Sequence, residues 1–361
     1  MFKYFSVAGI IILILIMANH PIFGGTIKGK RLERIKKSPN YKDGVFQNLS
    51  LTPSLAEGFT MRKVLWEFLT DKTPNKVPNK KIPSTKTDLK NQKLGDNFLV
   101  WMGHSSYYFQ LSGKRFLVDP VLSGNASPIP GTTKSFAGTD FYTTDDFPEI
   151  DFLIISHDHY DHLDYKTIKE LKPKIKTVIC GLGVGAHFER WGFDENQIIE
   201  LDWYDNRNLA DDFKITSTPA RHFSGRLFKR NTTLWSSYVL ESPGKKIFIG
   251  GDSGYDIHFK KIGETFGPFD WAILENGQYN EKWKYIHTLP EEFGKVVNDL
   301  NAKNIFPVHS GKFALAQHAW NEPLEKVKQN SLGNNYRLCT PMIGEKLNLD
   351  DESQTFSEWW K

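Results

Sequence analysis

Short apolar runs, each closed by polar residues or glycine, recur along the chain from about residue 97. One of them, residues 152–155, reads Phe-Leu-Ile-Ile and ends at Ser156. A run so uniformly apolar predicts a strand buried on both faces of a sheet. The same pattern predicts strands at residues 98–102, 107–111, 115–118, 177–180, 198–201, 213–218, 237–240, 246–249, 271–275 and 305–308.

Helices are predicted between several of these strands. Residues 165–171 have a helical pattern that Pro173 ends. The sequence Thr288-Leu-Pro-Glu291 has the form of a capping box and predicts a helix that runs to about residue 300. The chain therefore alternates strands with helices.

Metal-ligating side chains are concentrated directly after the strand at 152–155. His157, His159, Asp161 and His162 fall within one turn, in a chain that has only 11 histidines. Imidazoles and carboxylates so close together repel one another or protonate unless a cation joins them. Both are ligands of zinc, so the turn predicts a metal site.

Three other predicted strands also end in a potential ligand. His222, Asp252 and His309 each lie just beyond a strand, and Asp252 is flanked by glycines in Gly-Gly-Asp-Ser-Gly. Strand ends are where functional sites collect, so we expect these three side chains to join the first four. His104 and Asp119 also end strands; each is a candidate to support a ligand and is equally well explained as a structural residue.

The overall charge argues against a nucleic-acid partner. The chain has 46 Lys and Arg against 42 Asp and Glu, a net charge of +4, which indicates an ordinary, slightly basic surface. Its two cysteines, Cys180 and Cys339, form neither a disulfide framework nor a Cys-x-x-Cys zinc knuckle.

The amino-terminal residues 1–20 predict an anchor or a signal. Residues 5–18 are almost wholly apolar and are followed by a basic cluster between Lys28 and Lys37. The run is shorter than the roughly 20 residues of a full span. The basic cluster disfavours export, so we favour an uncleaved anchor and expect a membrane-associated protein, with the side of the membrane left open.

The remaining chain divides by composition. Residues 21–93, rich in Lys, Asn and Pro, predict a linker with a short helix at 61–69, whose apolar positions share one side and are expected to pack on the catalytic domain rather than to touch lipid. Residues 94–345 are expected to form that domain, and 346–361 a tail.

The motif His-x-His-x-Asp-His, followed by a distant His, Asp and His, resembles the metallo-β-lactamase superfamily. Four segments, S-H-D-H-Y-D-H-L-D-Y, E-L-D-W, G-D-S-G-Y and H-S-G-K-F-A-L, are similar to the branch of phospholipases D that hydrolyse N-acylphosphatidylethanolamine. The resemblance covers about residues 98–319. Ile286 departs from it, being apolar where a polar residue is expected.

The resemblance implies an αβ/βα sandwich, in which two mixed sheets face each other with helices outside. It also implies two zinc ions. His157, His159 and His222 would bind one, Asp161, His162 and His309 the other, and Asp252 would bridge them. His287 would lie near the metals.

The implied reaction is hydrolysis of a phospholipid phosphodiester by a metal-bridging hydroxide, at a site that also meets a membrane surface. Asp161 or Asp252 would orient the hydroxide, and His287 or a second water would protonate the leaving group. Arg221 and Arg226, which flank His222, are candidates to pair with the phosphate or are solvated surface charges.

Three alternatives remain open. A lactonase or other carboxyl-ester hydrolase would use the same dinuclear site, and a membrane-tethered metal-binding scaffold would retain the ligands without catalysis. A nuclease is disfavoured by the charge balance.

Overall fold

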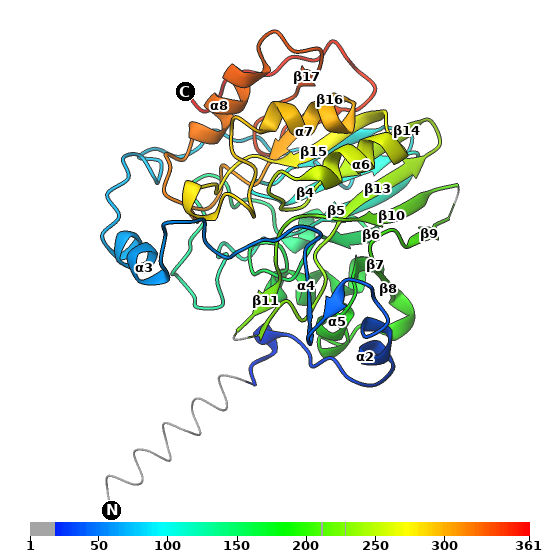
Figure 1. Cartoon of the computed structure of the whole chain (residues 1–361). Helices are drawn as coiled ribbons and strands as arrows, with labels where there is room; N and C mark the ends of the chain where they lie inside the picture. The colour runs from blue at the N-terminus through cyan, green and yellow to red at the C-terminus, as the bar shows by residue number, and fades with distance from the viewer. Residues whose placement is uncertain (1–18, 211, 228) are drawn as a thin grey trace, which may run out of the picture.

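The computed structural model describes residues 19–210, 212–227 and 229–361 (Figure 1). The predicted anchor at residues 5–18 lies outside the described residues. Among the helices that are described, none has the length and apolar composition needed to cross a membrane. The predicted membrane-associated localisation was wrong by this criterion.

Two seven-stranded sheets form the centre of the protein. Each sheet is parallel in one half and antiparallel in the other. Strands β5, β6, β7 and β8 run parallel in the first sheet, as do β14, β15, β16 and β17 in the second. The first sheet has the order β18 (Lys346–Asn348), β3 (Phe98–Trp101), β4 (Tyr107–Leu111), β5 (Lys114–Val118), β6 (Ile150–Ile155), β7 (Ile175–Gly181) and β8 (Ile198–Leu201). The second has the order β17 (Arg337–Leu338), β16 (Ala302–Val308), β15 (Phe269–Glu275), β14 (Lys245–Ile249), β13 (Ser237–Ser242), β10 (Lys214–Thr218) and β9 (Asn206–Asn208).

Successive side chains of a strand point to opposite faces of its sheet, so the apolar side chains form three layers: one between the sheets and one on the outer face of each sheet. Phe109 and Ile154 of the first sheet meet Tyr238 and Ile249 of the second in the central core. The opposite faces are covered by helices, α4 (Tyr165–Leu171) and α5 (Gly185–Arg190) on the first sheet, and α6 (Ile257–Phe266), α7 (Phe293–Leu300) and α8 (Glu322–Ser331) on the second. This four-layer arrangement confirms the predicted αβ/βα sandwich.

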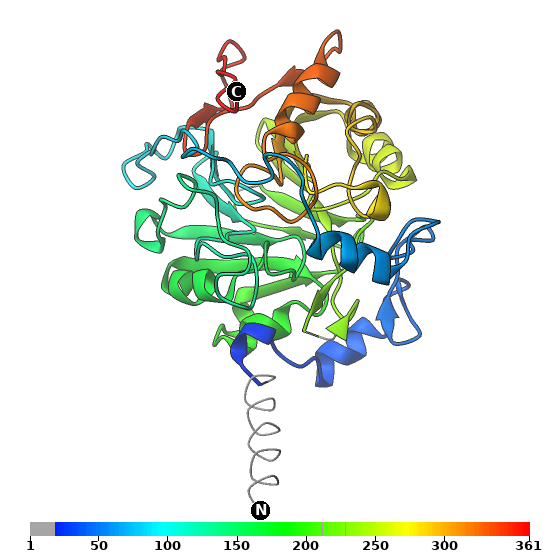
Figure 2. The same cartoon turned by 90° about the vertical axis from the view of Figure 1, so that its left-hand side faces the viewer.

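The residues expected to form a linker are packed on the sandwich (Figures 1 and 2, blue). They contain α2 (Gly29–Ile35) and the hairpin of β1 (Tyr41–Lys42) and β2 (Val45–Phe46). Ile35 and Phe46 are buried with Trp203 and Trp235 of the catalytic domain. Arg31 binds both Glu189 and Glu200 at 2.7 Å.

The last residues are likewise part of the core. Strand β18 pairs with β3, and the side chains of Trp359 and Trp360 are buried between the sheets. A tail rich in polar residues is thus held by its two terminal tryptophans.

Helix α3 (Met61–Leu69) has the predicted bounds and contacts the catalytic domain through Val64 and Glu67, whose carboxylate lies 2.6 Å from Lys282. Thr60 caps it by accepting a hydrogen bond from the Lys63 amide. Val64 is its buried residue, whereas Leu65 and Leu69 are 59% and 75% exposed. Its apolar side therefore faces mostly outward.

The Phe46 side chain tests whether residues 21–93 belong to the folded unit. Phe46→Ala is expected to lower the free energy of unfolding by about 3 kcal/mol, because a fully buried ring is replaced by a cavity. Leu51→Ala, at a side chain that is 90% exposed, is the control and should change it by less than about 0.5 kcal/mol. Urea denaturation measures both; equal small effects would show that this segment is a linker.

Candidate active site

Loops that follow four strands bring the seven predicted ligands together. The loop after β6 supplies His157, His159, Asp161 and His162, while β10, β14 and β16 lead into the other three. Each loop starts from a strand that is buried on both faces, so its position is fixed by the core.

His157, His159 and His222 form the first group. The Nε2 atom of His157 lies 2.8 Å from Nδ1 of His159, and Nε2 of His222 lies 3.3 Å from that same Nδ1. Ring nitrogens from two separate loops, those after β6 and β10, thus converge on one point. This is the geometry in which imidazole lone pairs share a cation.

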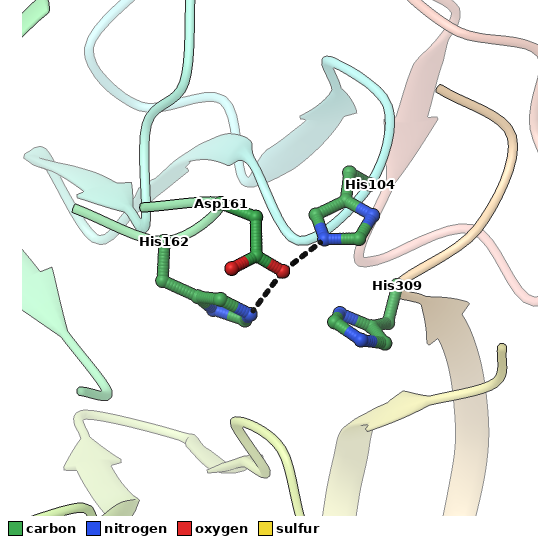
Figure 3. Close-up of side chains that lie close together, drawn as sticks. All are labelled: His104, Asp161, His162 and His309. Carbon is green, nitrogen blue, oxygen red and sulfur yellow. Dashed lines mark hydrogen bonds and ion pairs between the residues drawn. The ribbon is translucent and has the colours of Figure 1, made fainter. Parts of the chain in front are cut away.

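Asp161, His162 and His309 form the second group, together with His104 (Figure 3). The Oδ2 atom of Asp161 lies 2.9 Å from Nε2 of His104 and 3.5 Å from Nε2 of His162. The ring of His309 lies beside that of His104, with centroids 4.2 Å apart. His104 and His309 both have a positive φ, so the backbone is held in an uncommon conformation to point these rings inward.

Asp252 lies between the two groups. Its Oδ2 atom is 3.1 Å from Nε2 of His162 and 3.9 Å from Nε2 of His157. Its Oδ1 atom is 3.2 Å from Nδ1 of His309. The carboxylate therefore touches both sets of ring nitrogens.

Buried lone pairs without hydrogen-bond partners show that these residues fit a metal. Nε2 of His162 and Oδ1 of Asp252 have no hydrogen-bond partner among the described residues, although both atoms are shielded from solvent. Leaving such atoms unsatisfied costs about 1–3 kcal/mol each. A bound cation removes that cost, and the donor set of imidazole and carboxylate suits zinc or another divalent transition metal.

Burial keeps most of these imidazoles neutral. It lowers the pKa of His157, His222 and His309 well below the usual value, and the neighbouring imidazoles lower it further. Neutral imidazole is the form that binds a metal.

His162 differs from the other ligands. Burial by itself would lower its pKa, but the carboxylates of Asp252, Asp161 and Asp119 together raise it well above the usual value. A metal that binds at this ring has to displace a proton, so its affinity falls as the pH decreases.

Hydrogen bonds from outside the cluster set the ring orientations. Asp119 accepts from the amide and the hydroxyl of Ser156 and lies 2.8 Å from Nδ1 of His162. Nδ1 of His222 donates to the backbone carbonyl of Ile286, the residue whose apolar side chain departs from the family pattern. The contact uses the backbone of Ile286 and not that side chain. Such contacts fix which ring nitrogen faces the metal.

Asn48, outside the sandwich, also holds a predicted ligand, His222. Its side chain donates to the carbonyl of His222 at 2.8 Å and accepts from the amide of the same residue at 3.1 Å. The backbone of His222 is thereby clamped on both sides by a residue more than 170 positions away.

Sequence reasoning missed Glu275, which follows no ligand motif. This buried carboxylate lies 2.6 Å from Nδ1 of His287 and also accepts the amide of Thr288 at 2.6 Å. Burial raises the pKa of Glu275 and lowers that of His287. Thr288 is consequently not a helix cap, as the capping box predicted, and α7 begins only at Phe293.

A pocket of about 290 Å³ opens above the cluster. His159, Asp161, His222, Asp252, His287 and His309 lie along it. Its walls include Leu55, Met61, Phe223, Arg230, Trp283 and Leu315. A polar floor with mostly apolar walls suits a substrate whose reacting group is polar and whose remainder is apolar.

The two arginines proposed to pair with phosphate donate instead to the protein. Arg226 is buried and binds the carbonyls of Asp158, Leu163 and Ile22. Arg221 binds the carbonyl of Leu51 at 2.8 Å and the hydroxyl of Thr52 at 3.0 Å. Neither of them lines the pocket, whereas Arg230 does.

Comparisons with known proteins agree with this geometry. The β-lactamase superfamily domain matches residues 114–310. The chain is 34% identical over 331 residues to the uncharacterized protein Rv0906 of Mycobacterium tuberculosis, covering 90% of this chain and 88% of that protein. It is 34% identical over 250 residues to N-acyl-phosphatidylethanolamine-hydrolyzing phospholipase D 1 of Caenorhabditis elegans, covering 64% of this chain and 69% of that one.

Two solved structures share the fold. Igni18, a metallo hydrolase of the archaeon Ignicoccus hospitalis, superposes with a TM-score of 0.52 at 21% identity, covering 70% of this chain and 97% of that one. An isothiocyanate hydrolase from Delia radicum gut bacteria gives 0.54 at 20% identity, covering 69% and 98%.

His258, a buried histidine outside the cluster, supports the loop that carries Asp252. Nε2 of His258 lies 3.1 Å from the hydroxyl of Ser253, and burial lowers the pKa of His258 to about 3. The unfolded chain takes up a proton at this imidazole below about pH 6.5. The folded protein does so only near pH 3, so stability decreases as the pH falls through that window.

We therefore expect the free energy of unfolding to depend less on pH below pH 7 in His258→Gln than in the wild type. Between pH 7 and 5 the wild type should lose about 2 kcal/mol more than the variant in its free energy of unfolding. Urea denaturation at each pH measures the two curves, and the interval from pH 7 to 8 is the control in which they should run parallel. Parallel curves down to pH 5 would contradict the assignment.

Proposed function

The chain belongs to the metallo-β-lactamase superfamily, in the branch that includes N-acylphosphatidylethanolamine-hydrolysing phospholipase D, and on that premise we propose that it is a zinc-dependent phosphodiesterase that cleaves phospholipids. Two archaeal relatives, of Caldivirga maquilingensis and Aeropyrum pernix, are named metal-dependent hydrolases. The observation that carries the proposal is the buried cluster of seven ligands, of which His162 and Asp252 each leave an atom unsatisfied.

We assign two zinc ions to the two groups of ligands. His157, His159 and His222 would hold one ion. Asp161, His162 and His309 would hold the other, and Asp252 would contribute to both. His104 supports this set by binding the Oδ2 atom of Asp161 rather than as a ligand.

When bound, a pair of zinc ions activates water and offsets the negative charge that develops during displacement at phosphorus. The chain supplies the orientation. Asp161 and Asp252 are fixed by histidines on both sides and can direct the attacking water toward the pocket. The apolar walls exclude other water from the reacting group.

His287 is positioned to give a proton to the departing alkoxide. Its ring lies 5.1 Å from those of His222 and His309, at the edge of the ligand cluster. Glu275 binds Nδ1 and so leaves Nε2 as the nitrogen that a substrate can meet. With Glu275 protonated and donating to Nδ1, Nε2 carries the ring proton; Nε2 can give that proton to the leaving oxygen while Nδ1 takes the proton of Glu275, which becomes a carboxylate.

The branch of the family favours a phospholipid over other phosphodiesters. Relatives in a nematode and in yeast are named as phospholipases D that hydrolyse N-acylphosphatidylethanolamine. A pocket with a metal-binding floor and apolar walls suits a headgroup attached to acyl chains. The near-balanced charge gives no support for a nucleic-acid substrate.

A carboxyl-ester hydrolase is the second candidate. The same ligands and the same pocket suit attack on a lactone, because activated water reacts with carbonyl carbon as well as with phosphorus. The two candidates differ in the charge of the substrate, which is negative for a diester and neutral for a lactone.

We also propose one folded unit in place of separate segments. Residues 94–345 would form the catalytic domain, with 21–93 folded onto it through Phe46 and Asn48 and 346–361 anchored by Trp360.

Zinc content and product formation test the function together. Zinc-loaded wild type is expected to carry two equivalents by elemental analysis and to release the headgroup from a phospholipid, as mass spectrometry would show. EDTA should abolish the activity and added zinc should restore it. Turnover of a lactone alone, with no diester cleaved, would instead assign the carboxyl-ester class.

His159→Ala is the variant that ties activity to the cluster. It should lower zinc content and reduce turnover by at least about a hundredfold, while circular dichroism stays that of the wild type. His20→Ala, at an exposed histidine outside the cluster, is the matched control. Full turnover in His159→Ala would refute the site.

Glu275→Gln and His287→Gln test the buried pair. Each is expected to lower kcat about a hundredfold with two zinc ions retained, because proton transfer is impaired and the ligands are untouched. The double variant should be no slower than either single one, since the two residues act as a unit. Additive losses, or loss of zinc, would show that Glu275 has another role.

A further inference from the structure

We propose that Arg230, stacked on Phe223, forms an anion-binding subsite that receives a phosphate oxygen of the substrate beside the metal cluster. The inference rests on the proposed phosphodiesterase function and deepens it by naming what selects a charged substrate. It replaces Arg221 and Arg226, whose donors are already used by the protein.

Arg230 belongs to a short hairpin at the rim of the pocket. Strand β12 (Lys229–Arg230) pairs with β11 (Gly225–Arg226), so that Arg230 lies opposite Gly225. A side chain at Gly225 would come within 2.7 Å of the Lys229 carbonyl, which makes the glycine necessary for the close pairing of these two strands. The pairing of the two strands therefore sets the register at which Arg230 lies beside Gly225.

The guanidinium of Arg230 is aligned by an aromatic ring that itself touches the ligands. The Arg230 guanidinium carbon lies 4.1 Å from the centroid of Phe223. The Phe223 ring in turn lies 4.4 Å from that of His159 and 4.8 Å from that of His222. One aromatic ring thus separates the cation from the first ligand group, and the stacking leaves the N–H edge of the guanidinium free.

Arg230 also lacks an internal counter-ion. Across the part of the chain that the structure describes, no carboxylate forms an ion pair with it. Arg230 is exposed; partial desolvation by its neighbours lowers its pKa from a very high value, and the side chain remains charged. An exposed guanidinium that has no carboxylate partner among the described residues is open to an anion, and its fork of donors matches phosphate oxygens.

The adjacent Lys229 provides a matched control. It is an exposed cation on the same strand, but it lines a different cavity, of about 270 Å³, on the side of Asp158 and His187. Removing either charge changes the net charge equally. A difference between the two variants therefore reports position rather than general electrostatics.

The test uses zinc-loaded protein and two kinds of measurement. Isothermal titration calorimetry with diethyl phosphate, an anionic diester that serves as the probe, should show binding weakened about tenfold in Arg230→Ala and unchanged in Lys229→Ala. For an aryl phosphodiester, KM should rise about tenfold in Arg230→Ala, while turnover of a neutral aryl ester should stay within about twofold. Arg230→Lys should be intermediate, since it keeps the charge and loses the planar fork.

The outcomes separate the subsite from the proposed function. Equal affinity for diethyl phosphate in Arg230→Ala and wild type, or an equal loss in Lys229→Ala, would overturn the subsite even if the enzyme cleaves diesters. If the wild type cleaves only the neutral ester, the phosphodiesterase function fails, and the calorimetric comparison still decides whether Arg230 binds the anion. Loss of turnover on both substrates in Arg230→Ala would show a structural role and overturn the subsite as well.

Discussion

The structure depends on holding several imidazole and carboxylate groups close together in a site that is shielded from water. Five imidazoles and two carboxylates meet at the edge of two sheets, and their ring nitrogens approach to 2.8 Å. Burial alone would favour their separation, because neutral lone pairs repel and carboxylates lose solvation. The rigid strand ends, reinforced by Asp119 and Ser105 behind the rings, hold the arrangement until a cation completes it. Unusual backbone angles at His104, Asp119 and His309 are the local cost.

Much of the sandwich and the position of its site could be predicted from the sequence, because both follow from short-range patterns. Apolar runs mark the strands, and a ligand just beyond a run marks the edge where they converge. The turn after residues 152–155 is the strongest indication of a metal site, since four potential ligands lie within six residues there. The two-sheet arrangement itself came from a resemblance, as periodicity cannot pair strands that lie far apart in the chain.

Other features depend on tertiary contacts that no local pattern contains. Glu275 ends a strand like the ligands do, but its partner His287 follows twelve residues later in an irregular segment. Thr288 has the sequence of a helix cap, yet its amide is taken by Glu275 and its hydroxyl by the Ser253 carbonyl. Arg221 and Arg226 flank His222 in sequence but do not line the pocket, whereas Arg230 does. Arg230 reaches the pocket because the chain reverses between β11 and β12. Composition predicts a linker at residues 21–93, and it contains no signal for the burial of Ile35 and Phe46, because two apolar side chains do not change the polar character of a segment.

The clamp that Asn48 places on His222 has a consequence for the borders of the functional unit. The region matched by the superfamily domain begins at residue 114, well after this asparagine. A fragment trimmed to that region would contain all seven ligands and still lack the support that holds one of them. The part of this protein that can be moved intact into another chain is therefore larger than the region that the superfamily domain matches.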